Sequence, residues 1–203
     1  MPIYNPISLP SASAAALSRL VIDRPQGSAH PRFPALIYPL DYGYLEGTSA
    51  MDGEGVDVWV GTSPVNGLDA LLCVVDLPKR EVEVKLLLGC TEGEKQLALQ
   101  FQSQPPHMLA LLVRRKETCI EVTIRDNGCG MEPELLAAIR RGEEVSTKRV
   151  SGGIGLVNVS RRMEIFYKQT ELVDIASELD KGTTVTLLYP CREGEEAECT
   201  NCW

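Results

Sequence analysis

The stretch from Ile37 to Val60 constrains this chain more than any other, because it combines tyrosines, glycines and carboxylates at short spacing. Asp52, Glu54 and Asp57 stand at positions i, i+2 and i+5 within it. On an extended segment that enters a strand, the first two carboxylates share a face and the third lies one step further along. Such hard oxygen ligands favour magnesium, which binds one or two carboxylates, several waters and substrate phosphates. A second interpretation stays open, in which the same residues form only a polar hairpin turn.

Three phenol groups precede these carboxylates. Tyr38, Tyr42 and Tyr44 can donate hydrogen bonds to phosphate oxygens beside a bound metal ion. A calcium-binding EF-hand loop is excluded, because the sixth residue counted from Asp52 is Asp57 rather than glycine and the twelfth is a serine.

Four motifs in a fixed order resemble family I soluble inorganic pyrophosphatases of a short form. They are Val21-Ile-Asp-Arg-Pro, Tyr38-Pro-Leu-Asp-Tyr-Gly-Tyr, Asp52-Gly-Glu-Gly-Val-Asp-Val and Glu83-Val-Lys. The resemblance covers roughly residues 17–115 and implies a small β-barrel with a magnesium-dependent diphosphatase site. The metal ligands that it implies are Asp52, Glu54, Asp57 and Glu83. The substrate-binding residues that it implies are Arg24, Tyr38, Tyr42 and Lys85, and catalysis falls to Asp57, Tyr42, Lys85 and Arg24.

The sequence departs from that family pattern in several places. Glu54 and Glu83 stand where the family usually has aspartates, and an additional aspartate expected a few residues before Glu83 is absent. The upstream lysine and glutamates have no counterpart before Arg19. A non-catalytic protein therefore remains an alternative to an active hydrolase.

A second set of motifs begins after Arg115. Residues Cys119 to Arg125 alternate between apolar and polar side chains, which predicts a half-buried strand. Three glycine-containing strings follow: Asp126-Asn-Gly-Cys-Gly-Met, Gly152-Gly-Ile-Gly-Leu-Val-Asn and Lys181-Gly-Thr-Thr-Val-Thr. In this order they resemble the glycine boxes of the GHKL ATPase domain of sensor histidine kinases. The resemblance implies a partial Bergerat-type α/β sandwich over residues 116–190.

The same resemblance implies an adenine nucleotide, ATP or ADP, as a ligand. Its nucleotide-binding residues would be Asp126 for the adenine amino group, Gly128 and Gly130 beside the base, Gly153 and Gly155 near the phosphates, and Thr183 at the far wall. The phosphates would lie at a helix N-terminus, where free N–H groups and the helix dipole favour an anion. Alternatively, these glycines only form the turns of a strand-turn-helix unit.

The ATPase resemblance lacks one component. The family places a helix with a magnesium-binding asparagine before the first box, but no asparagine lies between Asn66 and Asn127. A histidine kinase also needs a phosphoacceptor histidine on a dimerisation helix. The two histidines here are predicted to be loop residues: His30 is interpreted as a surface or locally bonded imidazole, and His107 follows two prolines. We therefore expect no histidine kinase activity. A truncated sensor-kinase module that binds nucleotide weakly is the main alternative to a hydrolase.

Composition limits the partners of the chain. Its formal net charge of −8 argues against nucleic acid, which needs a basic surface. Its apolar runs are shorter than the roughly 18 residues of a membrane helix. No signal peptide is recognisable, so a cytoplasmic location is expected. Diphosphate or another phosphoanhydride and an adenine nucleotide are the expected ligands, and a homo-oligomer is left open.

The expected fold class is α+β in four segments: a flexible arm (1–16), the pyrophosphatase-like barrel (17–115), the partial GHKL unit (116–190) and an acidic tail (191–203). Strands are predicted at 20–23, 56–60, 71–75, 82–88, 108–113, 119–125, 172–177 and 183–188. Helices are predicted at 92–102, capped by Thr91, from Pro133 to Gly142, and from the second glycine box to about Gln169.

Overall fold

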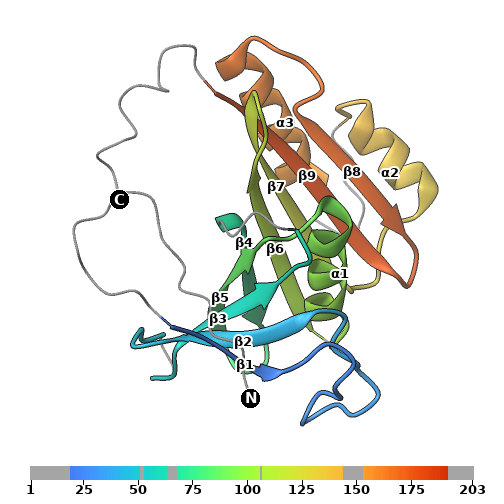
Figure 1. Cartoon of the computed structure of the whole chain (residues 1–203). Helices are drawn as coiled ribbons and strands as arrows, with labels where there is room; N and C mark the ends of the chain where they lie inside the picture. The colour runs from blue at the N-terminus through green and yellow to red at the C-terminus, as the bar shows by residue number, and fades with distance from the viewer. Residues whose placement is uncertain (1–18, 51–52, 64–67, 106, 144–152, 192–203) are drawn as a thin grey trace.

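The computed structural model of the chain describes residues 19–50, 53–63, 68–105, 107–143 and 153–191 (Figure 1). The strands are β1 (Arg19–Arg24), β2 (Asp41–Glu46), β3 (Val56–Val60), β4 (Leu68–Asp76), β5 (Glu81–Leu88), β6 (Met108–Arg115), β7 (Cys119–Asp126), β8 (Val173–Glu178) and β9 (Gly182–Pro190). The helices are α1 (Glu92–Ser103), α2 (Pro133–Arg140) and α3 (Gly153–Tyr167). The predicted α+β class is confirmed.

All described strands belong to one open sheet with the order β1-β2-β3-β5-β4-β6-β7-β9-β8. The predicted closed barrel over residues 17–115 is therefore wrong. A strand has two hydrogen-bonding edges, and β6 uses one for β4 and the other for β7. Neither edge of β6 remains to close a ring with the first strands, so the sheet continues into the C-terminal half of the chain instead.

The predicted elements agree with the observed ones to within a few residues. The capping box at the start of α1 is formed as expected, with Thr91 accepting from the Glu94 backbone N–H and the Glu94 carboxylate accepting from the Thr91 backbone N–H. The sequence analysis missed β2, because Asp41–Glu46 lacks a run of β-branched residues and contains a glycine.

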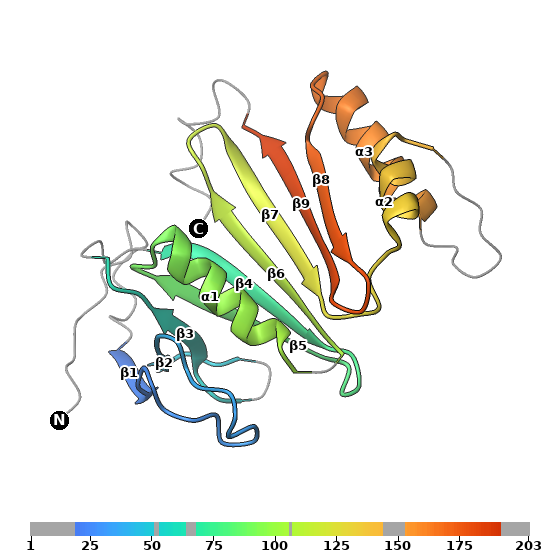
Figure 2. The ribbon, with the colours of Figure 1, turned by 90° about the vertical axis from the view of Figure 1, so that its right-hand side faces the viewer.

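The helices cover opposite faces of this sheet (Figure 2). Leu112 of β6 faces the same side as its partner Thr123 of β7, and this side packs against α1. Ile124 of β7 points to the other side, where α2 and α3 pack. The core on the α1 side includes Trp59, Leu72, Leu87, Leu99 and Leu112, and the core on the other side includes Ile139, Val157, Ile175 and Leu187.

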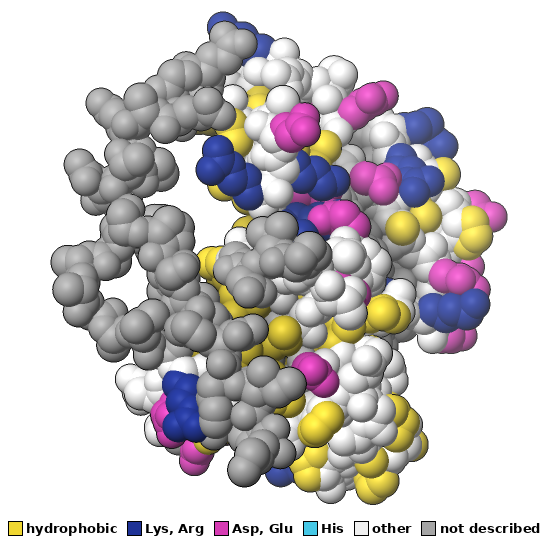
Figure 3. Space-filling model, viewed as in Figure 1, with side chains coloured by type: hydrophobic (Ala, Val, Ile, Leu, Met, Phe, Trp, Pro, Cys, Tyr) yellow, Lys and Arg dark blue, Asp and Glu magenta, His cyan; other side chains and the backbone are white. Residues whose placement is uncertain are grey.

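The sheet face opposite α1 is only partly covered by the described residues. Val82 and Val84 of β5 and Ile120 of β7 are each more than two-fifths exposed on it. Figure 3 shows hydrophobic side chains gathered along the middle of the molecule in the view of Figure 1. None of the helices within the described ranges is long and apolar enough to span a bilayer.

A buried ion-pair network ties the hairpin of β6 and β7 to α1. The Glu121 carboxylate accepts from Arg114 Nε at 2.6 Å and also pairs with Lys116. Arg114 pairs in turn with Glu92 in the first turn of α1. Burial alone would raise the pKa of Glu121, but the hydrogen bonds from Lys116 and Arg114 outweigh it and hold this pKa below its ordinary value.

We expect Glu121→Gln to lower the free energy of unfolding by about 2 kcal/mol at pH 7, because it removes charged hydrogen bonds from buried groups. A carboxyl group whose folded pKa is lowered stabilises the fold above its unfolded pKa, and this stabilisation is lost as pH falls through the folded pKa. Denaturant unfolding of both proteins should therefore converge at acidic pH. The exposed Glu117→Gln serves as control, and a constant difference from neutral to acidic pH would contradict the assignment.

Candidate functional site

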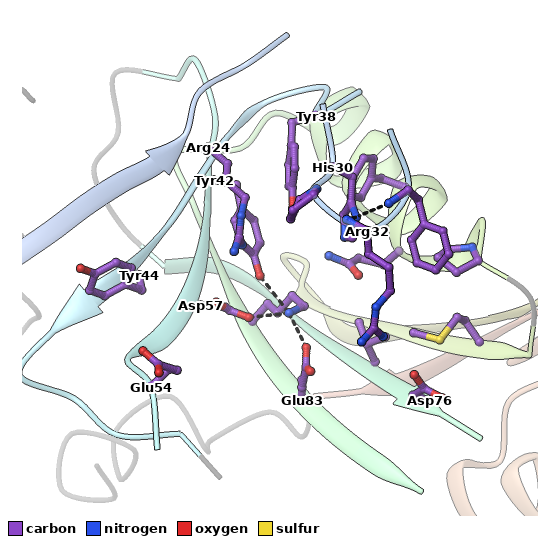
Figure 4. A pocket seen from close by; sticks show the side chains of 18 of the residues that line it. Arg24, His30, Arg32, Tyr38, Tyr42, Tyr44, Glu54, Asp57, Asp76 and Glu83 are labelled. Carbon is purple, nitrogen blue, oxygen red and sulfur yellow. Dashed lines mark hydrogen bonds and ion pairs between the residues drawn. The ribbon is translucent and has the colours of Figure 1, made fainter. Parts of the chain in front are cut away.

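A cavity of about 490 Å³ opens on the α1 side of the sheet (Figure 4). It brings together every described residue that the pyrophosphatase resemblance singled out, namely Arg24, Tyr38, Tyr42, Glu54, Asp57, Glu83 and Lys85. Asp52, the remaining predicted metal ligand, lies outside the described residues. The site residues come from β1, β2, β3, β5 and the loops between them, so the cavity depends on the sheet for its geometry.

The strand registers explain how the central residues converge. Asp57 of β3 pairs with Tyr44 of β2, which places it on the face of Tyr42 one step along the strand. Val58 pairs with Leu86 in the parallel β3–β5 ladder. Asp57 and Lys85, the residues just before this pair, therefore lie side by side on neighbouring strands. Side chains two residues apart share a face of a strand, which places Glu83 beside Lys85.

Lys85 is the centre of this cluster. Its ammonium group lies 2.5 Å from Asp57 Oδ2, 2.7 Å from Glu83 Oε2 and 2.9 Å from the Tyr42 hydroxyl oxygen. The residue is only 3% exposed, and a lysine at this depth is stable in its charged form only when it is paired. Three acceptors match the three N–H donors of an ammonium group.

Arg24 provides a second positive charge. The register of β1 and β2 shifts between Ile22 and Arg24, and such a bulge re-aims the side chain beside it. The guanidinium carbon lies 5.4 Å from the ring centroid of Tyr42 and 6.0 Å from that of Tyr38. Stacking of a guanidinium on aromatic faces holds it in place while its N–H groups remain able to bind an anion.

The carboxylates suit a magnesium ion that is bound together with a phosphate. Asp57 and Glu83 converge on Lys85, whereas Figure 4 shows Glu54 beside Tyr44, away from that cluster. Among the residues that the structure describes, no three acidic, histidine or cysteine side chains group closely enough to hold a metal by themselves. Magnesium needs only one or two carboxylates when waters and substrate phosphates complete its shell. Asp57 and Glu83 are the residues that would hold it.

The ionisation of the aromatic residues is shifted by the cavity. Burial, followed by the proximity of Asp57, raises the pKa of Tyr42 far above its ordinary value, so its phenol remains protonated and is able to donate. Burial also raises the pKa of Tyr38. Burial and then the charges of Arg24, Arg32 and Lys85 lower the pKa of His30, so its imidazole is neutral at pH 7.

Sequence reasoning missed the other end of the cavity. His30, Arg32 and Phe33 come from the loop after β1, and Phe101 and Met108 come from α1 and β6. The prediction that His30 is locally bonded is confirmed, because its Nδ1 accepts from the backbone N–H groups of Arg32 and Phe33. No periodic pattern marks this loop, so only the close packing of its rings could reveal its role.

The first and third glycine boxes meet at the end of β7. Asp126 Oδ1 accepts from the backbone N–H of Gly128 at 2.8 Å and from that of Thr183 at 3.3 Å. The Thr183 hydroxyl lies 3.0 Å from the Ser177 hydroxyl of β8. The fold thus gathers Asp126, Gly128 and Thr183 into one place, as the ATPase resemblance implies.

Two glycines in these boxes are required by backbone packing. Gly130 has φ +65° and Gly182 has φ +93°, conformations that residues with a side chain rarely adopt. A Cβ atom on Gly130 would lie 2.0 Å from the Glu178 carbonyl oxygen, and one on Gly182 would lie 2.1 Å from the Asp126 carbonyl oxygen. Gly153 and Gly155 of the second box begin α3, and Gly155 has open space beside it.

The helix that precedes the first box does not replace the missing asparagine arm. That helix is α1, whose sequence contains no asparagine. Its buried Leu99 and Phe101 pack with Trp59 and Leu112, on the face of the sheet opposite α3. Side chains of α1 therefore lie across the sheet from α3, the helix that begins with the second glycine box.

Comparison with known proteins shows what each part is similar to. A family model described as histidine kinase-, DNA gyrase B- and HSP90-like ATPase matches residues 96–193, from α1 to beyond β9. The Sensor protein LytS of Bacillus cereus is 30% identical over 97 residues, which cover 48% of this chain and 16% of LytS. The Sensor histidine kinase YesM of Bacillus subtilis is 28% identical over 98 residues, which cover 47% of this chain and 15% of YesM. The C-terminal half therefore resembles this ATPase family, and the chain spans about a sixth of these relatives.

Solved structures of inorganic pyrophosphatases are also similar to the chain. The enzyme from Coxiella burnetii is 17% identical, with coverage of 45% of this chain and 80% of that one and a TM-score of 0.32. The enzyme from Helicobacter pylori is 16% identical, with coverage of 46% and 79% and a TM-score of 0.31.

The packing of the first glycine box can be tested by stability. We expect Gly130→Ala to lower the free energy of unfolding clearly more than the roughly 1–2 kcal/mol that a left-handed alanine costs, because the added Cβ also meets a carbonyl oxygen. Gly27→Ala is the matched control, since Gly27 has φ +85° but nothing within 4 Å of an added Cβ. If chemical denaturation showed equal losses of unfolding free energy for Gly130→Ala and Gly27→Ala, the first glycine box would not be packed as described.

Proposed function

We propose that the chain hydrolyses a phosphoanhydride bond with magnesium, in the manner of an inorganic diphosphatase. The observation that carries this proposal is the buried Lys85 ammonium, held by Asp57, Glu83 and Tyr42 in a cavity that also contains Arg24. Cationic donors can stabilise a transferring phosphoryl group, and carboxylates on the same wall can hold the metal ion that activates water.

The charge of the cavity explains why a divalent cation is needed. Six carboxylates line it, against four lysine and arginine side chains. A bare diphosphate anion would therefore be repelled, because like charges at short distance disfavour one another. Magnesium would neutralise this excess and acidify a bound water.

The protein groups have separate roles in the proposed reaction. Arg24 donates hydrogen bonds to phosphate oxygens, and Lys85 donates one in exchange for its bond to Asp57 or Glu83. Tyr42 positions Lys85 through its hydroxyl oxygen. Asp57 accepts the proton of the attacking water. The water oxygen bonds to one phosphorus, the bridging P–O bond breaks, and its electron pair leaves with the second phosphate. Two phosphates are the products.

The first test is Asp57→Asn in the full chain. We expect kcat/KM for diphosphate to fall by at least about 100-fold, the usual effect of losing a general base. Asp174→Asn, at an exposed position of β8, is the matched control and should retain full activity. Chelation of magnesium should abolish phosphate release from the unaltered protein. Undiminished turnover by Asp57→Asn would overturn the assignment.

Binding of an adenine nucleotide near Asp126 is the second candidate function. It is favoured by the contact between the first and third glycine boxes and by the match of residues 96–193 to an ATPase family. Both hydrogen bonds described for Asp126 use Oδ1, so Oδ2 can accept from an adenine amino group. This match does not imply that the chain has the whole activity of the sensor relatives, because it spans only 16% of LytS.

We predict that this binding is weak and nearly independent of magnesium. A charged hydrogen bond from Asp126 contributes about 1.5–3 kcal/mol, and the dipole of α3 about 0.3–1 kcal/mol. Together these give a Kd of about 1 mM or weaker. Calorimetry with ADP, with and without magnesium, should show this, and Asp126→Asn should reduce the binding further. Tight, magnesium-dependent binding would mean that another carboxylate replaces the asparagine.

A further inference from the structure

We infer that the cavity takes an organic diphosphate monoester of the nucleoside diphosphate class in preference to inorganic diphosphate. This inference rests on the proposed hydrolase function and specifies its substrate. It follows from the size of the cavity and from the separation of its two ends.

The cavity is larger than the inorganic anion needs. Inorganic diphosphate has nine non-hydrogen atoms, whereas clefts of about 300–1,000 Å³ enclose ligands of drug size. The volume of about 490 Å³ lies within that range. Hydrated magnesium would occupy space near Asp57 and Glu83, but not at the opposite end.

The two ends of the cavity differ in chemistry. Figure 4 shows Glu54 and Tyr44 at one end, Asp57 and Glu83 near the centre, and Arg32 towards the other side. At that far side Met108 of β6 pairs in register with Asp76 of β4. Pro31, Phe33, Phe101 and Pro105 also line the cavity and add apolar surface to the polar side chains of Arg32, Asp76 and Gln102.

A cluster of aromatic rings, most of them tilted against one another, also lines the cavity. The His30 ring lies parallel to the Tyr38 ring, with centroids 5.8 Å apart and an interplanar angle of 13°. Phe33 lies 5.3 Å from His30, and Phe101 lies 4.8 Å from Tyr38. Phe33 lines the cavity and is 38% exposed, whereas Tyr38 and Phe101 are buried, so Phe33 is the more accessible ring for a ligand. An inorganic anion gains no binding energy by stacking on an aromatic ring, whereas a nucleobase does.

The reaction is the same with either substrate. Water attacks the terminal phosphorus, the bridging P–O bond breaks, and its electron pair leaves with the nucleoside monophosphate. The products are inorganic phosphate and the monophosphate ester, and the proton of the water passes to Asp57 and then to solvent. The diphosphate lies near Arg24 and Lys85, and the base lies near Phe33.

The test compares initial rates of phosphate release by the full chain from uridine diphosphate and from inorganic diphosphate, with magnesium. Uridine is chosen because it lacks the adenine group that Asp126 would bind. We expect the uridine ester to have the higher kcat/KM. Phe33→Ala should lower the ratio of kcat/KM for uridine diphosphate to that for inorganic diphosphate by roughly 5- to 150-fold, the range of one base–aromatic stack. Phe166→Ala, an exposed aromatic position on α3, should leave the ratio unchanged.

The outcomes separate this inference from the proposed function. Hydrolysis of inorganic diphosphate alone, with a ratio that Phe33→Ala does not change, would overturn the inference and leave the diphosphatase proposal standing. Hydrolysis of neither substrate would overturn the proposed function. In that case calorimetry with the methylene-bridged analogues decides the ligand class: binding of the uridine analogue that is weakened by Phe33→Ala supports the inference, and its absence refutes it.

Discussion

The pairing of β6 with both β4 and β7 is the constraint on which the rest of the structure depends. Met108–Arg115 matches seven residues of β4 on one edge and seven of β7 on the other. This double ladder joins the strands of the two halves, whose motifs resemble different families, into one sheet. The boundary expected near residue 115 falls in the turn between β6 and β7. Both candidate sites therefore belong to one sheet, in which β6 lies between the strands that carry the first site and those that carry the second.

Burial of one ammonium group sets the electrostatics of the first site. Leaving Lys85 unpaired at 3% exposure would cost several kcal/mol, and the fold avoids this by directing two carboxylates and a phenol at it. The same arrangement restrains Asp57 and Glu83, so neither carboxylate is free to hold a metal until an anion shares the lysine. Under the proposed function the metal and the phosphate would bind together, because each would release the partner that the other needs.

The sequence predicted those parts of the structure that depend on local pattern. Strand periodicity located β3, β5 and β7, and a capping box located α1. The resemblance to inorganic pyrophosphatases, rather than any local pattern, implied one site for Tyr42, Asp57 and Lys85, and the structure brings these three side chains together. Barrel closure was mispredicted, since it depends on which strand pairs with the far edge of β6, and that choice involves residues remote in sequence. The ring cluster of His30, Phe33 and Phe101 was missed for the same reason, because a loop and a helix meet there only after folding.

Helix α1 shows why the two resemblances do not yield two complete sites. The ATPase family match begins within α1, where that family would carry its asparagine-bearing helix. Here the buried residues of α1 include Ala98, Leu99 and Phe101, and the Phe101 ring lies near those of Tyr38, Trp59 and His30 at one wall of the cavity. A helix packed on one face of a sheet is separated from the other face by the sheet itself. Helix α1 forms one wall of the cavity, contains no asparagine, and lies on the face of the sheet opposite α3, so it does not supply the missing asparagine beside the glycine boxes.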